Sequence, residues 1–214
     1  NVTLLGCESD SSHNRSVISY MGEPEAVVEA AVKLAKKAAE LIDLTKHEGA
    51  HPRMGAVDVI PLIPIRGITK EETVELTKKL AKRISEEADI PVFLYEDSAS
   101  APHRVNLAKV RRGQFEGMAE KVQKPKWEPD FGGRRIHPTA GVVAVGCRMP
   151  LIAFNINLST DDVSIASEIA KIIRRSSGGL DCVKAMGLLL EDRNIAQVSI
   201  NMTDFCRTPL YRVL

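Results

Sequence analysis

The sequence predicts an α/β protein of the α+β sandwich type, with mixed β-sheets covered by helices and two subdomains. Strand-like and helix-like patterns alternate through the first half of the 214 residues, which is typical of a sheet covered by helices. Two strand pairs occupy the second half, and Gly178 with Gly179 breaks the pattern between them. We therefore expect a first subdomain over residues 1–177 and the start of a second over residues 178–214.

The chain opens with an apolar run at residues 2–7 that predicts a buried strand, followed by a polar loop at residues 8–17. Apolar residues then recur at helical spacing over residues 24–42. Pro24 suits the first turn of that helix, because a missing N–H costs nothing there.

The next elements continue the alternation. A β-rich run at residues 57–65 predicts a strand, and its two prolines place it at a sheet edge or a bulge because they lack an N–H donor. Thr69 and Glu72 form a capping-box pattern that begins a helix extending to about residue 88. Residues 92–96 predict the following strand. The order is β-α-β-α-β, which implies a sheet covered by helices.

The remaining chain is less regular. Two short helices are expected at residues 104–112 and 114–122, before a long loop of the kind that tends to bind ligands. Two strands within residues 141–158 are joined by a tight turn as a first hairpin, and an amphipathic helix follows at residues 161–175. Two further strands flank residues 191–194 and predict a second hairpin.

Composition narrows the classes of function. The chain holds 29 Lys and Arg against 28 Asp and Glu, so a net charge of +1 gives no case for nucleic acid or a membrane surface as a partner. The longest apolar run, residues 151–158, is far shorter than the roughly 20 residues that cross a bilayer. Four cysteines without a CxxC pair, and no secretion signal, indicate reduced thiols and a cytoplasmic location. A small-molecule site becomes the favoured expectation.

Residues 47–51 match the zinc-protease string H-E-x-x-H, but they do not predict a metal site. That chemistry needs a helix, since only helical spacing points both imidazoles at one metal. Gly49 interrupts such a helix, and Pro52 disfavours helical backbone at His51. We therefore expect no metal.

His51 is the main candidate for chemistry. It lies in a tight loop, residues 49–58, between a helix and a strand, and an ordinary pKa near neutrality suits a proton carrier. Arg53 close by could hold an anion. A histidine hydrogen-bonded to backbone and a solvated arginine are the alternatives, and the residues alone leave both open.

The polar loop after the first strand carries Glu8, Asp10, His13, Asn14 and Arg15. Loops that leave parallel strands at one edge of a sheet lie beside each other, so this loop could face the histidine loop. Ser, Asp and Asn also form ordinary turns, which leaves a purely structural loop as the alternative.

Amide side chains alternate along two of the later strands. Asn155 and Asn157 share one face, and Gln197, Ser199 and Asn201 share a face of another strand, because side chains two residues apart point the same way. Such rows are either solvent-exposed or line a polar groove that reads a ligand with many hydrogen-bonding atoms.

Six stretches invite comparison with known families: DSSHNRSV (10–17), GAHPRMGAVDVIPLIPIRG (49–67), PVFLYE (91–96), WEPDFG (127–132), AFNINL (153–158) and the region from VKAMG to NMTDF (183–205). Together, and in this order, they resemble the formiminotransferase domain of the formiminotransferase-cyclodeaminase family along almost the whole chain. Members of that family carry a strand and a helix before the position of Asn1 and a longer C-terminal subdomain after Leu214. The resemblance therefore implies a piece of a longer protein.

The resemblance implies transfer of the formimino group from N-formimino-L-glutamate to N5 of tetrahydrofolate, releasing glutamate, in histidine degradation. Tetrahydrofolate is then a cosubstrate, and the expected assembly is a homodimer. The catalytic histidine of the family falls on His51, with Glu8 or Asp58 as the carboxylate beside it. The expected substrate-binding residues are Asn14, Arg15, Arg53, Gln197 and Asn201. The folate-contacting loop falls on Gly132, Gly133, Arg134, Arg135, Ile136, His137, Pro138, Thr139, Ala140 and Gly141.

Two residues depart from the family pattern. Glu8 stands where relatives often have Asp, which alters the reach of that carboxylate. Arg134 and Arg135 make the folate loop unusually basic, which would favour a polyglutamylated folate.

Two other functions are compatible with the same residues. One is the handling of 5-formyltetrahydrofolate, as formyl transfer or as cyclo-ligation, since the same pocket could accept a formyl group. The other is a noncatalytic folate-binding paralogue, which would bind folate without forming product.

Overall fold

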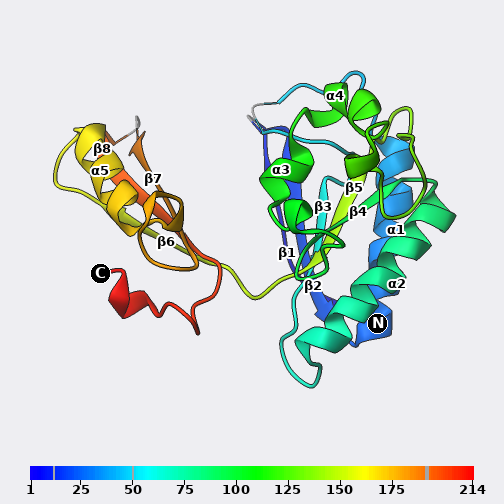
Figure 1. The fold of residues 1–214 in the computed structure, drawn as a ribbon, viewed down its shortest axis with the longest axis horizontal. Helices are drawn as coiled ribbons and strands as arrows, with labels where there is room; N and C mark the ends of the chain where they lie inside the picture. Colours follow the sequence, from blue (N-terminus) through cyan, green and yellow to red (C-terminus); the bar gives the residue numbers. More distant parts are fainter. Residues whose placement is uncertain (12, 50, 191–192) are drawn as a thin grey trace. The chain divides into compact units, whose positions relative to one another are not determined.

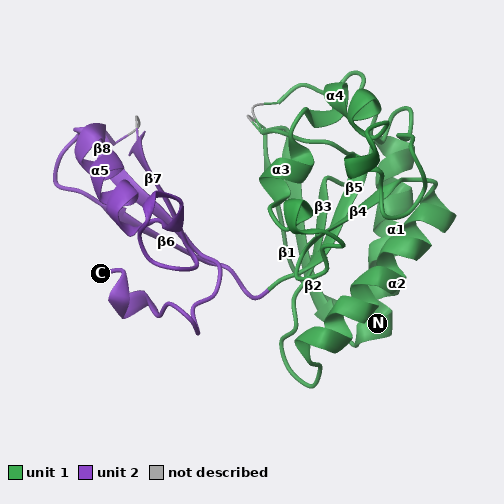
Figure 2. Cartoon of the chain, in the orientation of Figure 1, with its two compact units in different colours: residues 1–148 green, residues 149–214 purple. Residues whose placement is uncertain are grey.

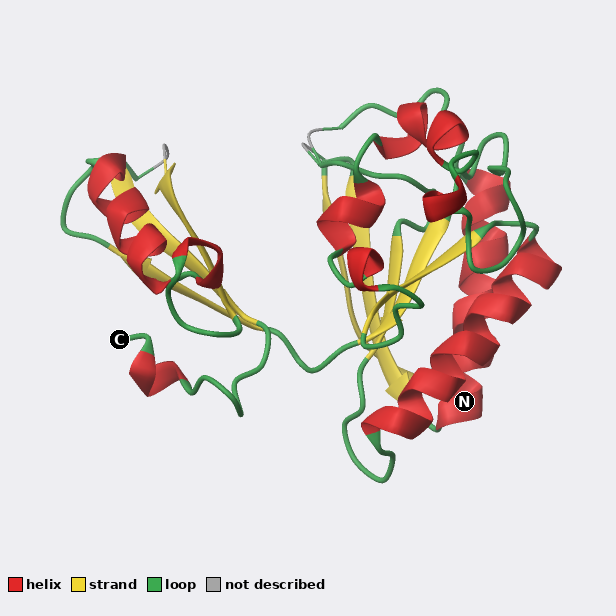
Figure 3. Cartoon of the chain, viewed as in Figure 1, coloured by secondary structure: helices red, strands yellow, loops and turns green. Residues whose placement is uncertain are grey.

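The computed structural model describes residues 1–11, 13–49, 51–190 and 193–214, and it divides the chain into two compact units, Asn1–Arg148 and Met149–Leu214 (Figure 2). Each unit contains helices packed on a β-sheet, which confirms the predicted α/β class (Figure 3). The division falls earlier than the boundary predicted at residues 177 and 178. Strand β6 (Ile152–Asn157) precedes that point and yet pairs with β8 (Ile195–Met202), so both strands belong to the second unit.

A three-stranded parallel sheet of order β3–β5–β4 forms the centre of the first unit (Figure 1). Its strands are β3 (Val59–Leu62), β4 (Val92–Glu96) and β5 (Val143–Cys147). The middle strand, β5, is buried along its whole length, which accounts for its continuous apolar sequence. β3 lies at an edge of this sheet, as Pro61 predicts.

Helices cover both faces of the parallel sheet (Figure 1). α1 (Pro24–Leu41) and α2 (Lys70–Ala88) pack on one face, and α3 (Leu107–Arg111) and α4 (Gln114–Lys121) pack on the other. Successive side chains of β4 alternate between these two apolar clusters, which is the period of a strand buried on both sides. Two short 3-10 turns, Pro102–Arg104 and Pro125–Trp127, complete the second layer.

The predicted capping box begins α2. The Glu72 N–H donates to Thr69 Oγ1 at 3.2 Å, and the Thr69 N–H donates to Glu72 Oε2 at 2.8 Å. The helix ends where Asp89 adopts the left-handed region at φ 57°.

The N-terminal strand differs from its prediction. β1 (Val2–Asp10) is longer than expected and pairs antiparallel with β2 (Arg15–Gly22), a strand that the sequence did not predict. This hairpin is a separate two-stranded sheet, and β1 is exposed rather than buried, with Leu4 and Leu5 at 63% and 59% exposure. An apolar run predicts a strand, but it does not show whether another element covers that strand.

The second unit packs one helix on an antiparallel sheet of order β6–β8–β7 (Figure 1). β7 (Val183–Leu190) and β8 form the predicted second hairpin, whose turn residues 191–192 lie outside the described residues. The predicted first hairpin is wrong, because β5 belongs to the parallel sheet of the first unit and β6 pairs with β8. The predicted amphipathic helix is α5 (Val163–Ile173). Across the described residues, no helix is both long and apolar enough to span a membrane.

Candidate active site

The turn between β1 and β2 meets the loop that carries His51. The Asn14 Nδ2 group donates to the Glu48 carbonyl oxygen at 2.8 Å, and His47 Nε2 lies 2.8 Å from the Asn14 carbonyl oxygen. The rings of His13 and His51 lie 6.1 Å apart, centroid to centroid. The expectation that these two loops face each other is confirmed, although the first is a hairpin turn and not a loop leaving the parallel sheet.

The loop of residues 42–58 is held against the amino edge of the parallel sheet, not the carboxyl edge. Asp58 directly precedes β3, and its carbonyl oxygen accepts the Ala144 N–H of β5 at 3.1 Å. In its described part this loop contains no helix, so His47 and His51 are not presented at helical spacing. Within the described residues, no three His, Cys, Asp or Glu side chains are grouped to hold a metal ion.

His51 is partly buried among positive charges. Burial lowers the pKa of the imidazole first, and the nearby Arg15 and Arg111 guanidinium groups and His13 lower it further. The Asp58 carboxylate acts in the opposite direction. The net effect is a pKa below the ordinary value of 6.5, so His51 is mainly neutral at pH 7 and able to accept a proton.

Asp58 anchors this arrangement. Arg111 Nη2 donates to Asp58 Oδ2 at 2.6 Å, and the Met54 N–H donates to Asp58 Oδ1 at 2.9 Å. Both charged side chains are largely buried, at 17% and 18% exposure. Asp58 therefore fixes the loop and α3 to each other while its charge acts on His51.

Arg53 is bound differently from the expectation that it holds a substrate anion. Its guanidinium donates to both carboxylate oxygens of Glu116, at 2.9 and 2.6 Å, and to the His47 carbonyl oxygen at 3.2 Å. The Glu116 partner raises the pKa of Arg53. The side chain thus ties α4 to the histidine loop, and binding a substrate would require it to leave this partner.

The glycine-rich loop of residues 132–141 is joined directly to the histidine loop. Gly55 and Gly141 form an antiparallel bridge, the Ala56 N–H donates to the Ala140 carbonyl oxygen at 3.0 Å, and the Met54 carbonyl oxygen accepts from Val142. Gly141 has φ +65°, and a Cβ there would collide with the Met54 carbonyl oxygen. Glycine is needed at this position because of both the backbone conformation and the close approach.

The two arginines of the glycine-rich loop have carboxylate partners. Arg134 donates to Glu128 at 3.0 and 2.9 Å, and Arg135 pairs with Asp89. These pairs neutralise the basic character that the sequence suggested, which weakens the case for attraction of a polyglutamate tail. The same loop is ordered internally by His137, whose Nδ1 accepts the Ala140 N–H at 3.0 Å.

Three predicted residues, Glu8, Gln197 and Asn201, take no part in the contacts described above. Glu8 is exposed on β1, opposite Val17 of β2. Gln197 and Asn201 belong to the second unit, where Gln197 Nε2 donates to Asn157 Oδ1 at 2.7 Å. They lie on the sheet face that α5 leaves open, since the alternate residues of β8 are buried beneath α5. The predicted division of β6 and β8 into a polar and an apolar face is confirmed.

Sequence reasoning missed Arg111 and Glu116. Arg111 meets Asp58, and Glu116 meets Arg53, across more than fifty positions of sequence. No local pattern marks either residue, because the contacts arise only when α3 and α4 pack over the sheet. His13, in contrast, was named in the polar loop expected to face His51, and its ring lies 6.1 Å from that of His51.

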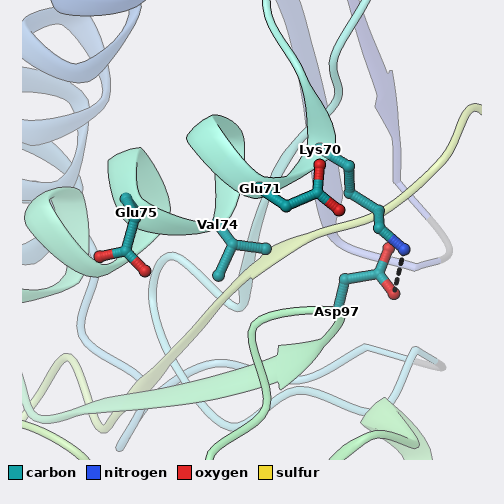
Figure 4. Close-up of a pocket in the computed structure, with 5 residues that line it drawn as sticks. All are labelled: Lys70, Glu71, Val74, Glu75 and Asp97. Atoms are coloured by element: carbon teal, nitrogen blue, oxygen red, sulfur yellow. Dashed lines mark ion pairs between the residues drawn. The ribbon is translucent and has the colours of Figure 1, made fainter.

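An open pocket adjoins the site. It has a volume of about 290 Å³ and is lined by Pro52, Ala108, Arg111, Arg112, Gly113 and Gln114. A second pocket of about 270 Å³ lies where α2 begins and β4 ends, and it is lined by Lys70, Glu71, Val74, Glu75 and Asp97 (Figure 4). There Lys70 and Asp97 form an ion pair at 3.8 Å, and the other ionisable groups are acidic. Of these two pockets, the first contains Pro52, which follows His51 in sequence, and Arg111, whose charge acts on His51.

The fold and site define a class of protein. It is a two-unit α/β protein with a pocket and with a neutral histidine close to arginines. Such a histidine is suited to proton transfer on an anionic substrate. Comparison with known families makes this specific. Residues 1–148 match the formiminotransferase domain, N-terminal subdomain, and residues 153–214 match the formiminotransferase domain. The chain belongs to the formiminotransferase family, and the two matches coincide with the two compact units.

Individual relatives agree with the family. The chain is 60% identical over 211 residues to glutamate formimidoyltransferase of Streptococcus pyogenes, covering 99% of this chain and 71% of the relative. It is 43% identical to glutamate formimidoyltransferase of Thermoplasma acidophilum, covering 99% of this chain and 70% of the relative. It is also 43% identical to formimidoyltransferase-cyclodeaminase of Mus musculus, covering 98% of this chain but 40% of that longer protein.

Proposed function

We propose that this protein is a transferase that moves the formimino group from N-formimino-L-glutamate to N5 of tetrahydrofolate and releases glutamate, with His51 as the proton carrier. The observation that carries the proposal is the combination of two facts. The chain is 60% identical, over 99% of its length, to a protein named glutamate formimidoyltransferase. Within it, a neutral and partly buried imidazole stands between two polar loops at the edge of the sheet.

The chemistry requires two proton movements. The N5 amine attacks the formamidine carbon, and the new C–N bond forms a tetrahedral adduct. N5 must then lose its proton, while the glutamate nitrogen must gain one before its C–N bond breaks. One base that accepts the first proton and donates the second satisfies both needs, and proton balance is kept.

His51 fits this double role because of its surroundings. As a neutral imidazole at pH 7 it can accept the proton from N5. Once protonated, it faces the cations Arg15 and Arg111, so the imidazolium is a stronger acid than usual and donates readily to the departing nitrogen. Asp58 limits this effect and keeps the protonated form accessible.

Other residues orient the substrates. We assign Arg15 and Asn14 of the hairpin turn to the donor, and the loop of residues 132–141 to the folate, since that loop is bonded to the histidine loop. The open sheet face of the second unit carries hydrogen-bonding groups of its own, including the side chains of Gln197 and Asn201, which suit a polar ligand. Holding two substrates in register accounts for much of the rate gain of such a transfer.

A steady-state assay with both one-carbon donors tests the proposal. Purified full-length protein should transfer the group from formiminoglutamate to tetrahydrofolate, and it should not use a formyl donor at a comparable rate. The variant His51→Gln, which keeps a side chain of similar length, should lose roughly 10²- to 10⁴-fold in kcat. Near-normal turnover in that variant, or a preference for the formyl donor, would overturn the assignment.

We also infer the setting of the reaction. The formimino donor supports a role in histidine degradation, the four free cysteines favour the cytoplasm, and the resemblance to the family supports a homodimer. Analytical ultracentrifugation of the full-length protein should give twice the chain mass; a monomer that is fully active would contradict this assembly.

A further inference from the structure

The pocket beside His51 has a structure of its own. It is lined by Pro52, the residue that follows His51, by α3, and by the turn into α4. Arg111 links pocket and site, because the residue lines the pocket while its guanidinium pairs with Asp58 and lowers the pKa of His51. A group bound in the pocket therefore lies at Arg111, whose charge acts on the proton carrier.

One cation of this pocket has no carboxylate partner. Arg111 is paired with Asp58, and Arg53, which does not line the pocket, is paired with Glu116. Arg112 is exposed at the pocket wall, and within the part of the chain that the structure describes it forms no ion pair. The pocket thus combines an unpaired guanidinium with the side-chain amide of Gln114, a donor set suited to a carboxylate.

We propose that this pocket binds a carboxylate of the group donor, with the Arg112 guanidinium as its main ligand and the Gln114 amide as a second. This inference rests on the proposed function and deepens it, because it names the residues that select a dicarboxylic donor. Arg112 makes the contact in place of Arg53, whose guanidinium is already taken by Glu116.

The chemistry of the two substrates favours the donor over the folate as the occupant. In formiminoglutamate, the α-carboxylate is attached to the same carbon as the reacting nitrogen. In tetrahydrofolate, the glutamyl carboxylates are separated from N5 by the whole aminobenzoyl group. A carboxylate pocket that shares Arg111 with the surroundings of His51 suits the donor, whose carboxylate is close to its reacting nitrogen, better than the folate tail, which is far from N5.

The test is a kinetic comparison of Arg112→Gln with the wild-type full-length protein. We expect the KM for formiminoglutamate to rise roughly tenfold to a hundredfold, because a hydrogen-bonded ion pair to the substrate is lost. The KM for tetrahydrofolate should remain within about twofold, and kcat should fall much less than in His51→Gln. Arg112→Lys, which keeps the charge but not the forked geometry, should recover part of the loss. Arg66→Gln is the matched control, since Arg66 is an exposed arginine away from this pocket and should leave both constants unchanged.

The acceptor without a glutamyl tail, tetrahydropteroate, separates the two sources of carboxylate. If the effect of Arg112→Gln on the KM for the donor persists with this acceptor, the pocket holds the donor. If Arg112→Gln raises the KM for tetrahydrofolate but not for tetrahydropteroate, the pocket holds the folate tail and the inference is wrong. If Arg112→Gln is active and its KM for the donor is unchanged, the pocket does not bind the donor carboxylate, but the proposed function stands. If the wild-type protein transfers no formimino group, the proposed function itself is wrong.

Discussion

Replacing Asp130 by asparagine should destabilise the first unit through a buried ion pair. Arg104 Nη1 donates to Asp130 Oδ2 at 2.8 Å, and the same oxygen accepts the Leu94 N–H of β4 at 2.7 Å. The two charged side chains are only 8% and 10% exposed. The Asp130→Asn change keeps the shape of the residue and removes its charge, which leaves the guanidinium buried without a counter-ion.

The expected loss follows from this geometry. Removing one partner of a buried ion pair typically costs about 3–5 kcal/mol. Arg104 keeps hydrogen bonds to the carbonyl oxygens of Lys126 and Glu128, so the lower end, about 3 kcal/mol, applies. For a unit of this size each kcal/mol shifts the midpoint by about 2–4 °C, so Tm should fall by roughly 6–12 °C.

The measurements are urea unfolding, for the free energy, and thermal unfolding, for Tm, both followed by the fluorescence of Trp127. The sequence contains one tryptophan, and it lies in the first unit, so the signal reports on that unit. The matched control is Glu128→Gln, which breaks the ion pair between Glu128 and Arg134. Because both of these side chains are nearly half exposed, the loss in free energy of unfolding should stay below about 1 kcal/mol. Equal destabilisation by the two changes would refute the argument from burial.

Three further changes test other parts of the structure. Arg111→Gln should raise the pKa of His51, because it removes a cation that lowers this pKa. The fall of kcat/KM on acidification should then begin at a higher pH than in the wild type. A pH profile whose acidic side is unmoved, or shifted to lower pH, would contradict the effect assigned to Arg111. Lys121 donates to three carbonyl oxygens at the end of α3, and burial lowers its pKa to about 8. Lys121→Met should therefore lower the free energy of unfolding, measured in urea, by about 1–3 kcal/mol. An unchanged free energy of unfolding would mean that the cost of burying the ammonium cancels the gain from those hydrogen bonds. Gly141→Ala should lower the free energy of unfolding more than Gly133→Ala in the same assay. Both glycines have a positive φ, but only at Gly141 would an added Cβ collide with backbone atoms. Equal losses would show that this collision has no energetic cost.

Much of the fold was predictable where the signal is local. The capping box at Thr69 and Glu72 begins α2, and β4 occupies the predicted residues 92–96. These signals depend on neighbours within a few positions, so they survive whatever packs around them. The strand partners were not predictable in the same way. Residues 148–150 resemble a hairpin turn, yet the strands on its two sides pair with partners at least forty positions away.

The same distinction between local and long-range signals applies to the site. Side chains on two short polar turns, such as Asn14 and His51, were identified because turn chemistry is visible in sequence, and the fold brings those turns together. Arg111 and Glu116 reach the site only through the packing of α3 and α4. Glu8, expected beside the histidine, lies on an exposed strand because β1 continues as far as Asp10 before the hairpin turns.

Chemical rescue tests the central claim most directly. His51→Ala in the full-length protein removes the imidazole and leaves space for a free one, and transfer is measured with increasing imidazole at fixed pH. If residue 51 carries protons between the two nitrogens, activity falls by orders of magnitude and returns in proportion to added imidazole, more strongly with imidazoles whose pKa lies near the working pH. A variant that transfers the formimino group at the wild-type rate without imidazole would contradict the account.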